Sequence, residues 1–309
     1  MNAFESTDDT RSDKSLSDKS LSENSLRDKS LTHVQTVTFE GPVPLERGAD
    51  LPRVTCAFET WGTLNDDASN AILICHAISG DSHAARHDAN DAPGWWDTLI
   101  GPGKAIDTDR FFVICPNVLG GCRGSTGPSD PMPECSPARP FGADFPDITI
   151  DDMVNVQKRL LDSLGISELV AVVGGSLGGH QALTWARRYP NCLRACIALA
   201  TSPRLTSQAL GFDVVARNAI QTDPHFNGGQ YYDQIEKPDT GLAIARMLGH
   251  ITYLSSDAME GKFELDRHDP REIASDFEQK FSKFTDRFDA NSYITLSMAM
   301  DLFDLGRSR

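Results

Sequence analysis

The sequence predicts an α/β protein in which a mostly parallel sheet with an antiparallel start is followed by a helical segment. The runs at 34–40 and 53–62 alternate polar and apolar residues, which is typical of an antiparallel hairpin. Later β-rich runs are almost continuously apolar, as in strands covered on both faces, and helical patterns lie between them. After Thr201 the strand pattern stops.

The predicted parallel core has four apolar runs: AILICHA at 71–77, RFFVICP at 110–116, ELVAVVGG at 168–175 and LRACIALA at 193–200. The clearest helix between them lies in 148–165, where apolar residues recur at helical spacing and Gly165 supplies a stop. Further helices are expected at 206–222, 238–255, 271–284 and 289–304. A helical block after a parallel sheet suggests a cap over the carboxyl ends of the strands, where such sheets bind ligands.

The first segment differs in composition from the rest. SDKSL at 12–16 recurs at 17–21 and degenerates to SENSL and RDKSL by residue 31. One leucine per unit buries too little apolar area to offset the ordering entropy of the chain. We therefore expect a disordered tail at 1–33, a sheet core at 34–202 and a helical cap at 203–309.

The overall composition limits the class of function. Acidic residues outnumber basic ones by 44 to 29, giving a formal charge of −15, which disfavours binding to nucleic acid or anionic lipid. No apolar run approaches the roughly 20 residues of a membrane span, and the N-terminus does not resemble a signal peptide. The seven cysteines form no CxxC pair or ligand-type cluster. We expect a cytoplasmic protein with buried, reduced thiols, no metal and small-molecule or protein partners.

A glycine-rich stretch, VVGGSLGGHQALTWARRYP at 172–190, contains the pattern G-x-S-x-G around Ser176. A buried-strand run ends at this pattern and a helical run begins there, which is the context of a nucleophile elbow. Such a turn strains the serine backbone, and glycines at the flanking positions avoid clashes. Ser176 is therefore the candidate nucleophile, with the Leu177 N–H as an oxyanion donor. The alternative is a glycine-rich turn with an incidental serine.

Two further loops follow buried strands. The loop after 71–77 is small and polar, and the N–H of Ser79 is the candidate for a second oxyanion donor. His76 and His83 flank this loop, and without metal-type spacing we expect both to have hydrogen-bonded structural roles. The glycine-rich loop at 117–131 is not a P-loop, but its N–H groups are candidates for phosphate contact.

Eight separated stretches resemble the homoserine O-acyltransferases of the α/β-hydrolase superfamily, which acylate homoserine in methionine biosynthesis. The similarity runs from about Val34 to the last residue. Esterases and lipases share the elbow but not the other seven stretches. The stretches are FETWG (58–62), HAISGDSHA (76–84), GWWDTLIGPGKAIDT (94–108), NVLGGCRGSTGPS (117–129), FPDITIDDMV (145–154), GGSLGGHQALTWA (174–186), ARMLGHITYLS (245–255) and RFDANSYITLSMAMDLFDLG (287–306).

The resemblance implies an α/β-hydrolase fold and a two-step exchange. Ser176 takes the acyl group from acyl-CoA, a cosubstrate, and the homoserine hydroxyl then attacks the acyl-enzyme. Leu177 and Ser79 match the oxyanion positions, and no bound cofactor is implied. Arg246 and Tyr253 match residues that hold the amino-acid substrate, where the planar fork of an arginine suits a carboxylate. The resemblance also implies a homodimer formed through the cap helices.

The sequence departs from the family at the catalytic Asp and His, which the family places on loops beyond the cap. None of the histidines after Ser176 matches that base: His180, His225, His250 and His268. His180, one helical turn beyond the nucleophile, is expected to point away from it. We therefore expect the last strands and helix of the fold to be missing from these 309 residues. Two alternatives stay open: an esterase or thioesterase, and a catalytically dead binding protein. Acetyl is the default acyl group, with succinyl as donor group and serine as acceptor also open.

Overall fold

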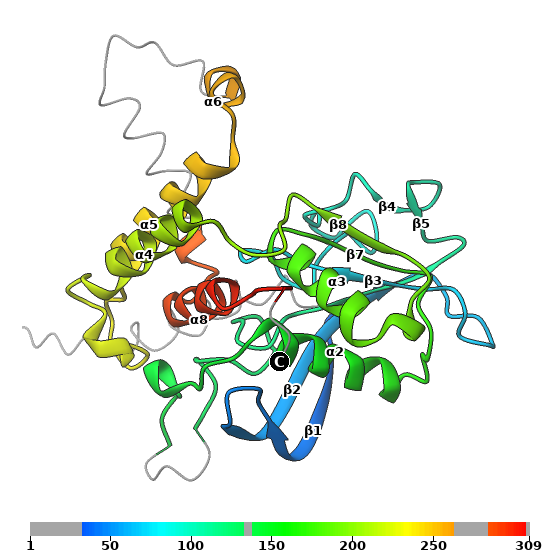
Figure 1. Cartoon of the computed structure of the whole chain (residues 1–309), viewed down its shortest axis with the longest axis horizontal. Coiled ribbons are helices and arrows are strands. Elements are labelled where there is room, and N and C mark those ends of the chain that lie inside the picture. Colours follow the sequence, from blue (N-terminus) through cyan, green and yellow to red (C-terminus); the bar gives the residue numbers. More distant parts are fainter. Residues whose placement is uncertain (1–32, 133–137, 263–283, 307–309) are drawn as a thin grey trace, which may run out of the picture.

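The computed structural model describes residues 33–132, 138–262 and 284–306. A six-stranded sheet forms one side of the molecule, and helices that follow it in the sequence form the other (Figure 1). The strands, in spatial order, are β1 (Gln35–Pro44), β2 (Asp50–Trp61), β6 (Phe112–Pro116), β3 (Ala71–Cys75), β7 (Ala171–Gly175) and β8 (Cys196–Leu199).

The pairing of these strands confirms a mixed sheet with an antiparallel start. β1 pairs antiparallel with β2, and β2 pairs antiparallel with β6. From β6 onward the pairs β6–β3, β3–β7 and β7–β8 are parallel. Because parallel strands all point the same way, the loops after β3 and β7 leave the sheet at one edge, side by side. A separate pair of two-residue strands, β4 (Ile100–Gly101) and β5 (Ile106–Asp107), was not predicted.

The helices agree with the predicted pattern. The α-helices are α2 (Ile150–Ser163), α3 (Leu177–Arg188), α4 (Ser207–Gln221), α5 (Asp239–Tyr253), α6 (Ser256–Lys262) and α8 (Ala290–Asp301). Short 3₁₀ turns are η1 (Gly142–Asp144), η2 (Pro190–Cys192) and η3 (Asn227–Gly229). A capping box begins α2, since Thr149 and Asp152 satisfy each other's backbone N–H groups. The helix expected at 271–284 falls almost wholly outside the described residues, and α6 was not predicted.

The β8 strand corrects one expectation, because it is not covered on both faces. Cys196 contacts the Ala182 carbonyl of α3, so one face of β8 lies toward that helix. Ile197 and Leu199 alternate with it, face the opposite way, and are 44% and 42% exposed. The continuous apolar run at 193–200 therefore forms a strand that is not covered on both faces by the described residues.

The cysteines agree only in part with the expectation of buried thiols. All six in the described ranges are free, and Cys56, Cys75 and Cys115 are buried. Cys196 is exposed although its Sγ meets α3, because β8 is an edge strand of the described sheet, and Cys122 and Cys192 are partly exposed. Cys135 lies outside the described residues.

The helical segment starts and ends at neighbouring points. Arg204 forms an antiparallel bridge with Asp304, and the Leu305 N–H donates to the Pro203 carbonyl at 2.8 Å. Between these points, α4, α5 and α8 lie together at one side of the sheet (Figure 1). The boundaries at 202 and 203 stay predictions, and the tail predicted at 1–33 lies outside the described residues except for His33. No described helix has the length and apolar character needed to cross a membrane.

Candidate functional site

Ser176 stands between β7 and α3 with a backbone conformation that few non-glycine residues adopt. Its φ is 55° and its ψ is −120°, the strained geometry predicted for an elbow. A Cβ at Gly174 would lie 2.2 Å from the Gly178 carbonyl oxygen. A Cβ at Gly178 would lie 2.0 Å from the Cys75 carbonyl oxygen. The two glycines therefore let the start of α3 pack directly against the ends of β7 and β3.

The two candidate oxyanion donors lie on the loops that leave β7 and β3. Leu177 is the first residue of α3, so its N–H has no intrahelical partner. Ser79 lies in a turn closed by a 2.9 Å hydrogen bond from the Gly80 N–H to the Ala77 carbonyl. The Ser79 carbonyl accepts a hydrogen bond from the Arg287 guanidinium at 3.1 Å, which joins this loop to the helical segment. The use of both N–H groups in catalysis stays a prediction.

A cavity of about 310 Å³ opens beside Ser176. It lies between the sheet edge and the helices of the predicted cap. Its lining combines Ser176 and Ile78 with cap side chains, among them Phe212, Asp213, Tyr253, Tyr293 and Met300. A nucleophile, a carboxyl group and two tyrosines thus share one space, which can admit a small polar substrate.

The two predicted substrate-binding residues lie together on α5. Tyr253 lines the cavity, whereas Arg246 does not line it directly. The Arg246 guanidinium lies 5.9 Å from the centre of the Tyr253 ring and 5.2 Å from that of Phe284. The structure therefore brings the pair to one side of the cavity, and its role in binding stays a prediction.

Asp213 is a cavity residue that the sequence analysis missed. Burial, and then the neighbouring Asp301 carboxyl, raises the pKa of Asp213 to about 7. Asp301 accepts a 2.6 Å hydrogen bond from Arg217, which also donates to the Ser297 hydroxyl. The sequence offered one indication of this residue, a single charged side chain within the apolar stretch LGFDVVA at 210–216. Its pairing with Asp301 could not be predicted, because it depends on how α4 packs against α8.

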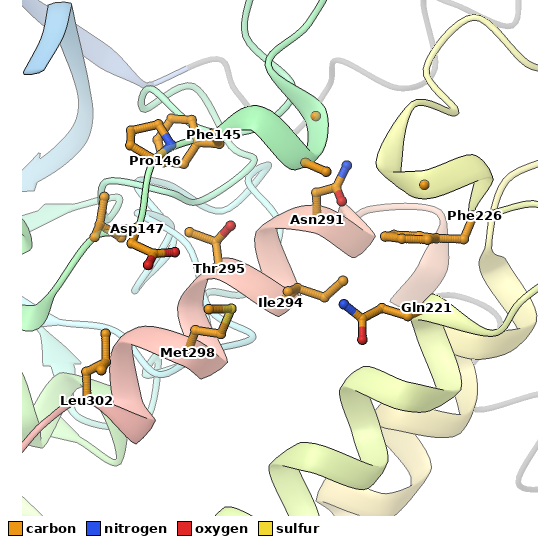
Figure 2. A pocket seen from close by; sticks show the side chains of 14 residues that line it. Phe145, Pro146, Asp147, Gln221, Phe226, Asn291, Ile294, Thr295, Met298 and Leu302 are labelled. Atoms are coloured by element: carbon orange, nitrogen blue, oxygen red, sulfur yellow. The ribbon is translucent and has the colours of Figure 1, made fainter. Parts of the chain in front are cut away.

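A second cavity of about 330 Å³ does not contain the nucleophile. Figure 2 shows Ile294, Thr295 and Met298 of α8 lining one side of it. Gln221 and Phe226 line another part, and Asp147 carries its acidic group (Figure 2). Asp147 pairs with Arg47 at 3.3 Å, and no other side chain in the described lining of this cavity is titratable.

His180 does not serve as a base in this geometry. Its ring stacks on Phe303 with the centroids 4.3 Å apart, and burial lowers its pKa to about 4. Its Nδ1 has no hydrogen-bond partner within the described ranges. This agrees with the expectation that His180 points away from the nucleophile. Across the described residues, no histidine ring is hydrogen-bonded to the Ser176 hydroxyl.

His76 has the predicted structural role, and it fixes the glycine-rich loop at 117–131. Its Nε2 accepts a hydrogen bond from the Val118 N–H at 3.1 Å, and Nδ1 lies 2.8 Å from the Ala77 carbonyl. Other loop N–H groups bond internally: Gly120 to the Thr126 carbonyl, and Gly127 to the Asp130 carboxylate. The suggested phosphate contact is therefore wrong for these groups, because their hydrogen bonds already hold the loop against the sheet.

His83 also has the predicted hydrogen-bonded role, in a cluster around Glu59 of β2. His83 Nδ1 and His87 Nε2 both lie 2.9 Å from Glu59 Oε2, and the Ser82 hydroxyl donates to Oε1. The spacing of these side chains could hold a metal ion, and in this structure the histidine rings are hydrogen-bonded to the Glu59 carboxyl. Burial raises the pKa of Glu59, yet the hydrogen bonds from His83 and His87 outweigh it and lower the value to about 2. The bond to Glu59 raises the pKa of His83 to about 9 against the effect of burial.

These shifts predict a stability that depends on pH. A raised histidine pKa stabilises the fold below the unfolded value of 6.5, and this contribution is lost as pH rises through 9. A lowered carboxyl pKa stabilises the fold above 4.5 and is lost as pH falls toward 2. Urea unfolding should show that His83→Gln is less stable than the unmodified chain by roughly 3 kcal/mol at pH 6. The difference should shrink by pH 9.5.

The matched control for this measurement is His225→Gln, because the His225 side chain is 45% exposed and its closest carboxyl is that of Glu236 at the surface, 3.1 Å away. It should change the unfolding free energy little at either pH. A gap between His83→Gln and the unmodified chain that is the same at both pH values would contradict the ion pair.

The parallel sheet, the strained serine elbow and the cavity beside it define an alpha/beta hydrolase. A family model described as the alpha/beta hydrolase fold matches residues 70–290. Within that class, the chain belongs to the homoserine O-acyltransferase family. It is 52% identical over 279 residues to a homoserine O-succinyltransferase of Alkalilimnicola ehrlichii, covering 86% of this chain and 72% of that protein.

Another relative is about twice as long as this chain. The bifunctional methionine biosynthesis protein MetXA/MetW of Rhodopirellula baltica is 65% identical over 314 residues, covering 98% of this chain and 48% of the relative. The chain thus spans about half the length of that protein.

Two solved structures carry the same fold with different names. A homoserine O-acetyltransferase from Bacillus anthracis matches with a TM-score of 0.77 and 35% identity, covering 88% of this chain and 76% of that one. Esterase E22 matches with a TM-score of 0.79 and 36% identity, covering 88% and 79%. The fold alone therefore does not separate acyl transfer to an amino acid from ester hydrolysis.

Proposed function

We propose that the chain carries out acyl transfer from an acyl-CoA, with acetyl-CoA as the first choice, to the hydroxyl of L-homoserine. The single observation that supports it most is Ser176, which stands in a strained elbow at a cavity shared with Tyr253. Tyr253 belongs to a stretch that resembles the substrate-binding helix of the family. Relatives named for homoserine acylation support the reaction class.

The proposed reaction has two steps with balanced bonds. The Ser176 oxygen attacks the thioester carbonyl, the carbon–sulfur bond breaks, and CoA leaves as the thiol with the serine proton. The homoserine hydroxyl then attacks the acyl-enzyme, which restores Ser176 and releases the O-acyl amino acid. The Leu177 and Ser79 N–H groups would stabilise the oxyanion in both steps. Among the described residues no histidine ring is hydrogen-bonded to the Ser176 hydroxyl, so the proposal names no residue as the base.

The acyl donor and the reaction class can be tested together. Acetyl-CoA or succinyl-CoA is incubated with the chain, with and without homoserine, while free thiol and O-acylhomoserine are measured. Thiol release that requires homoserine supports the proposal, and the faster donor identifies the acyl group. Serine replaces homoserine in a parallel reaction to test the acceptor.

Ester hydrolysis is the second candidate, and the similarity to esterase E22 favours it. It uses the same elbow with water as the acceptor. Thiol release at the same rate without homoserine would support the hydrolase. Stabilisation of the fold by homoserine without any turnover would instead support a binding protein.

The proposal includes a cytoplasmic location and a homodimer formed through the cap helices. Free cysteines suit a reducing compartment. Apolar side chains exposed on the cap helices support a dimer, because exposed apolar patches mark interaction surfaces. They are Phe212, Val214, Val215, Ile244, Ile251 and Met298.

Arg246→Ala is expected to weaken homoserine binding roughly 10- to 100-fold, because it removes a charge-assisted contact to the substrate carboxylate. Arg246→Lys should retain part of the affinity, since an ammonium keeps the charge but not the planar fork. Isothermal titration of homoserine measures both. The control is Arg194→Ala, which removes a surface pair with Glu168 far from the cavity. Equal affinity in Arg246→Ala and the unmodified chain would rule out this role.

A further inference from the structure

One carboxyl group, that of Asp213, lines the cavity beside Ser176, and a second carboxyl lies next to it. Asp213 of α4 lines the cavity, and its carboxyl stands against that of Asp301 of α8. One guanidinium, that of Arg217, serves this pair, and its 2.6 Å bond goes to Asp301 rather than to Asp213. The Asp213 carboxyl, which faces the cavity, is therefore not the one that Arg217 bonds.

A buried pair of carboxyls needs a positive charge or a shared proton. Asp301 Oδ1 is buried and has no donor in the described part of the chain, so a bond across the pair requires a proton on one carboxyl. Arg217 neutralises one of the two negative charges, and the second remains. A cation that enters the cavity can take the place of that proton at Asp213.

A positive charge lies beside one of the tyrosines of the same cavity. Tyr253 and Tyr293 both line the cavity, as Asp213 does. The Arg246 guanidinium lies 5.9 Å from the centre of the Tyr253 ring. A carboxyl group and a guanidinium group therefore lie at one tyrosine-lined space. A zwitterion with its carboxylate toward Arg246 and its ammonium toward Asp213 would match that arrangement.

We propose that Asp213 is the subsite for the α-ammonium group of the acceptor, and that the Asp213–Asp301 pair exchanges its proton for this cation. The inference rests on the proposed function, which supplies an amino acid as the acceptor. It adds a basis for specificity: a hydroxyl compound without an ammonium leaves the Asp213 carboxyl unpaired, and water does the same. Asp213 thus selects amino-acid acceptors over other alcohols.

The sign of the proton exchange follows from the charges that face Asp213. Burial and the Asp301 carboxyl oppose its ionisation, whereas the Arg217 guanidinium favours it. An incoming ammonium adds a further positive charge, so it lowers the pKa of Asp213 from its value of about 7. Binding at pH 7 therefore releases a fraction of a proton, and raising pH from 6 to 8 strengthens binding.

The test compares two ligands and two forms of the chain. Homoserine and 4-hydroxybutyrate, which lacks only the ammonium, are titrated calorimetrically into the unmodified chain and into Asp213→Asn. We expect Asp213→Asn to bind homoserine roughly 10- to 100-fold more weakly and 4-hydroxybutyrate within about twofold of the unmodified chain. Titrations in buffers of different ionisation enthalpy should show proton release in the unmodified chain and none in Asp213→Asn.

Two controls separate recognition from damage to the fold. Asp130→Asn alters another carboxyl whose pKa is raised by burial but which lies outside the cavity, and it should leave homoserine binding unchanged. Thermal unfolding of Asp213→Asn checks that the variant is folded. The comparison of the two ligands on the unmodified chain requires no variant at all.

The binding results distinguish a wrong assignment of Asp213 from a wrong proposed function. If homoserine binds equally well to both forms, or without proton release, Asp213 is not the ammonium subsite, while the proposed function stands. Equal affinity of the unmodified chain for homoserine and 4-hydroxybutyrate would overturn the inference in the same way. If the unmodified chain binds neither ligand, the proposed function fails and the inference fails with it.

Discussion

Replacing Ser176 with alanine should lower the rate of acyl transfer by at least about a thousandfold and leave the fold intact. The proposed reaction proceeds through a bond to the serine oxygen, and alanine has no atom that can form it. Alanine keeps the Cβ of serine, so the strain at a φ of 55° is unchanged. Mass spectrometry of the intact chain after mixing with acetyl-CoA measures the acyl-enzyme directly.

The control for this experiment is Ser163→Ala, on α2, where the hydroxyl donates a hydrogen bond to the Leu160 carbonyl of its own helix. It should acquire the acyl group as the unmodified chain does. An acyl group found on the Ser176→Ala protein would identify a different nucleophile and remove the basis of the proposed mechanism.

Gly178→Ala should destabilise the fold by on the order of 4 kcal/mol or more, because the new methyl group meets backbone that cannot turn aside. Its Cβ would lie 2.0 Å from the Cys75 carbonyl oxygen, at the end of the central strand β3. Relieving that contact moves α3 away from the sheet and carries Ser176 and the Leu177 N–H with it. Urea unfolding measures the loss of stability.

Gly211→Ala is the matched control, at a glycine where a methyl group has free space. Gly211 lies inside α4, and a Cβ there would meet nothing within 4 Å. Alanine should therefore stabilise the chain by roughly 0.5–1 kcal/mol through its helix propensity. If the two substitutions had similar effects, the close packing at the elbow would not be what requires a glycine.

The positions of the main strands along the chain and the elbow could be predicted from the sequence because both depend on local patterns. Continuous apolar runs with helices between them specify a parallel sheet, and a strand, two glycines and a helix around Ser176 specify the turn. The conflict that forces the glycines is visible in the structure, at Gly174 and Gly178. The sequence pattern indicated where glycines are needed, but not that the group Gly178 avoids is the Cys75 carbonyl.

What could not be predicted depends on contacts between segments distant in the sequence. Asp213 and Asp301 are 88 residues apart in numbering, and only the packing of α4 on α8 makes them a pair. The exposure of Ile197 has a similar cause, since an apolar run says nothing about which neighbour covers it. Likewise, the N–H of Gly120 is used by Thr126 within its own loop, which a search for phosphate-binding glycines cannot detect.

The bridge between Arg204 and Asp304 has a consequence for how this family can diversify. Because the chain at Asp304 comes back beside Arg204, just after the last described strand, the segment between these residues can change without separating its two ends. Changes in its length or sequence can reshape the cavity beside Ser176 while the serine keeps its place. One scaffold can thus evolve separate chemistries, which fits its likeness both to an esterase and to a homoserine acetyltransferase.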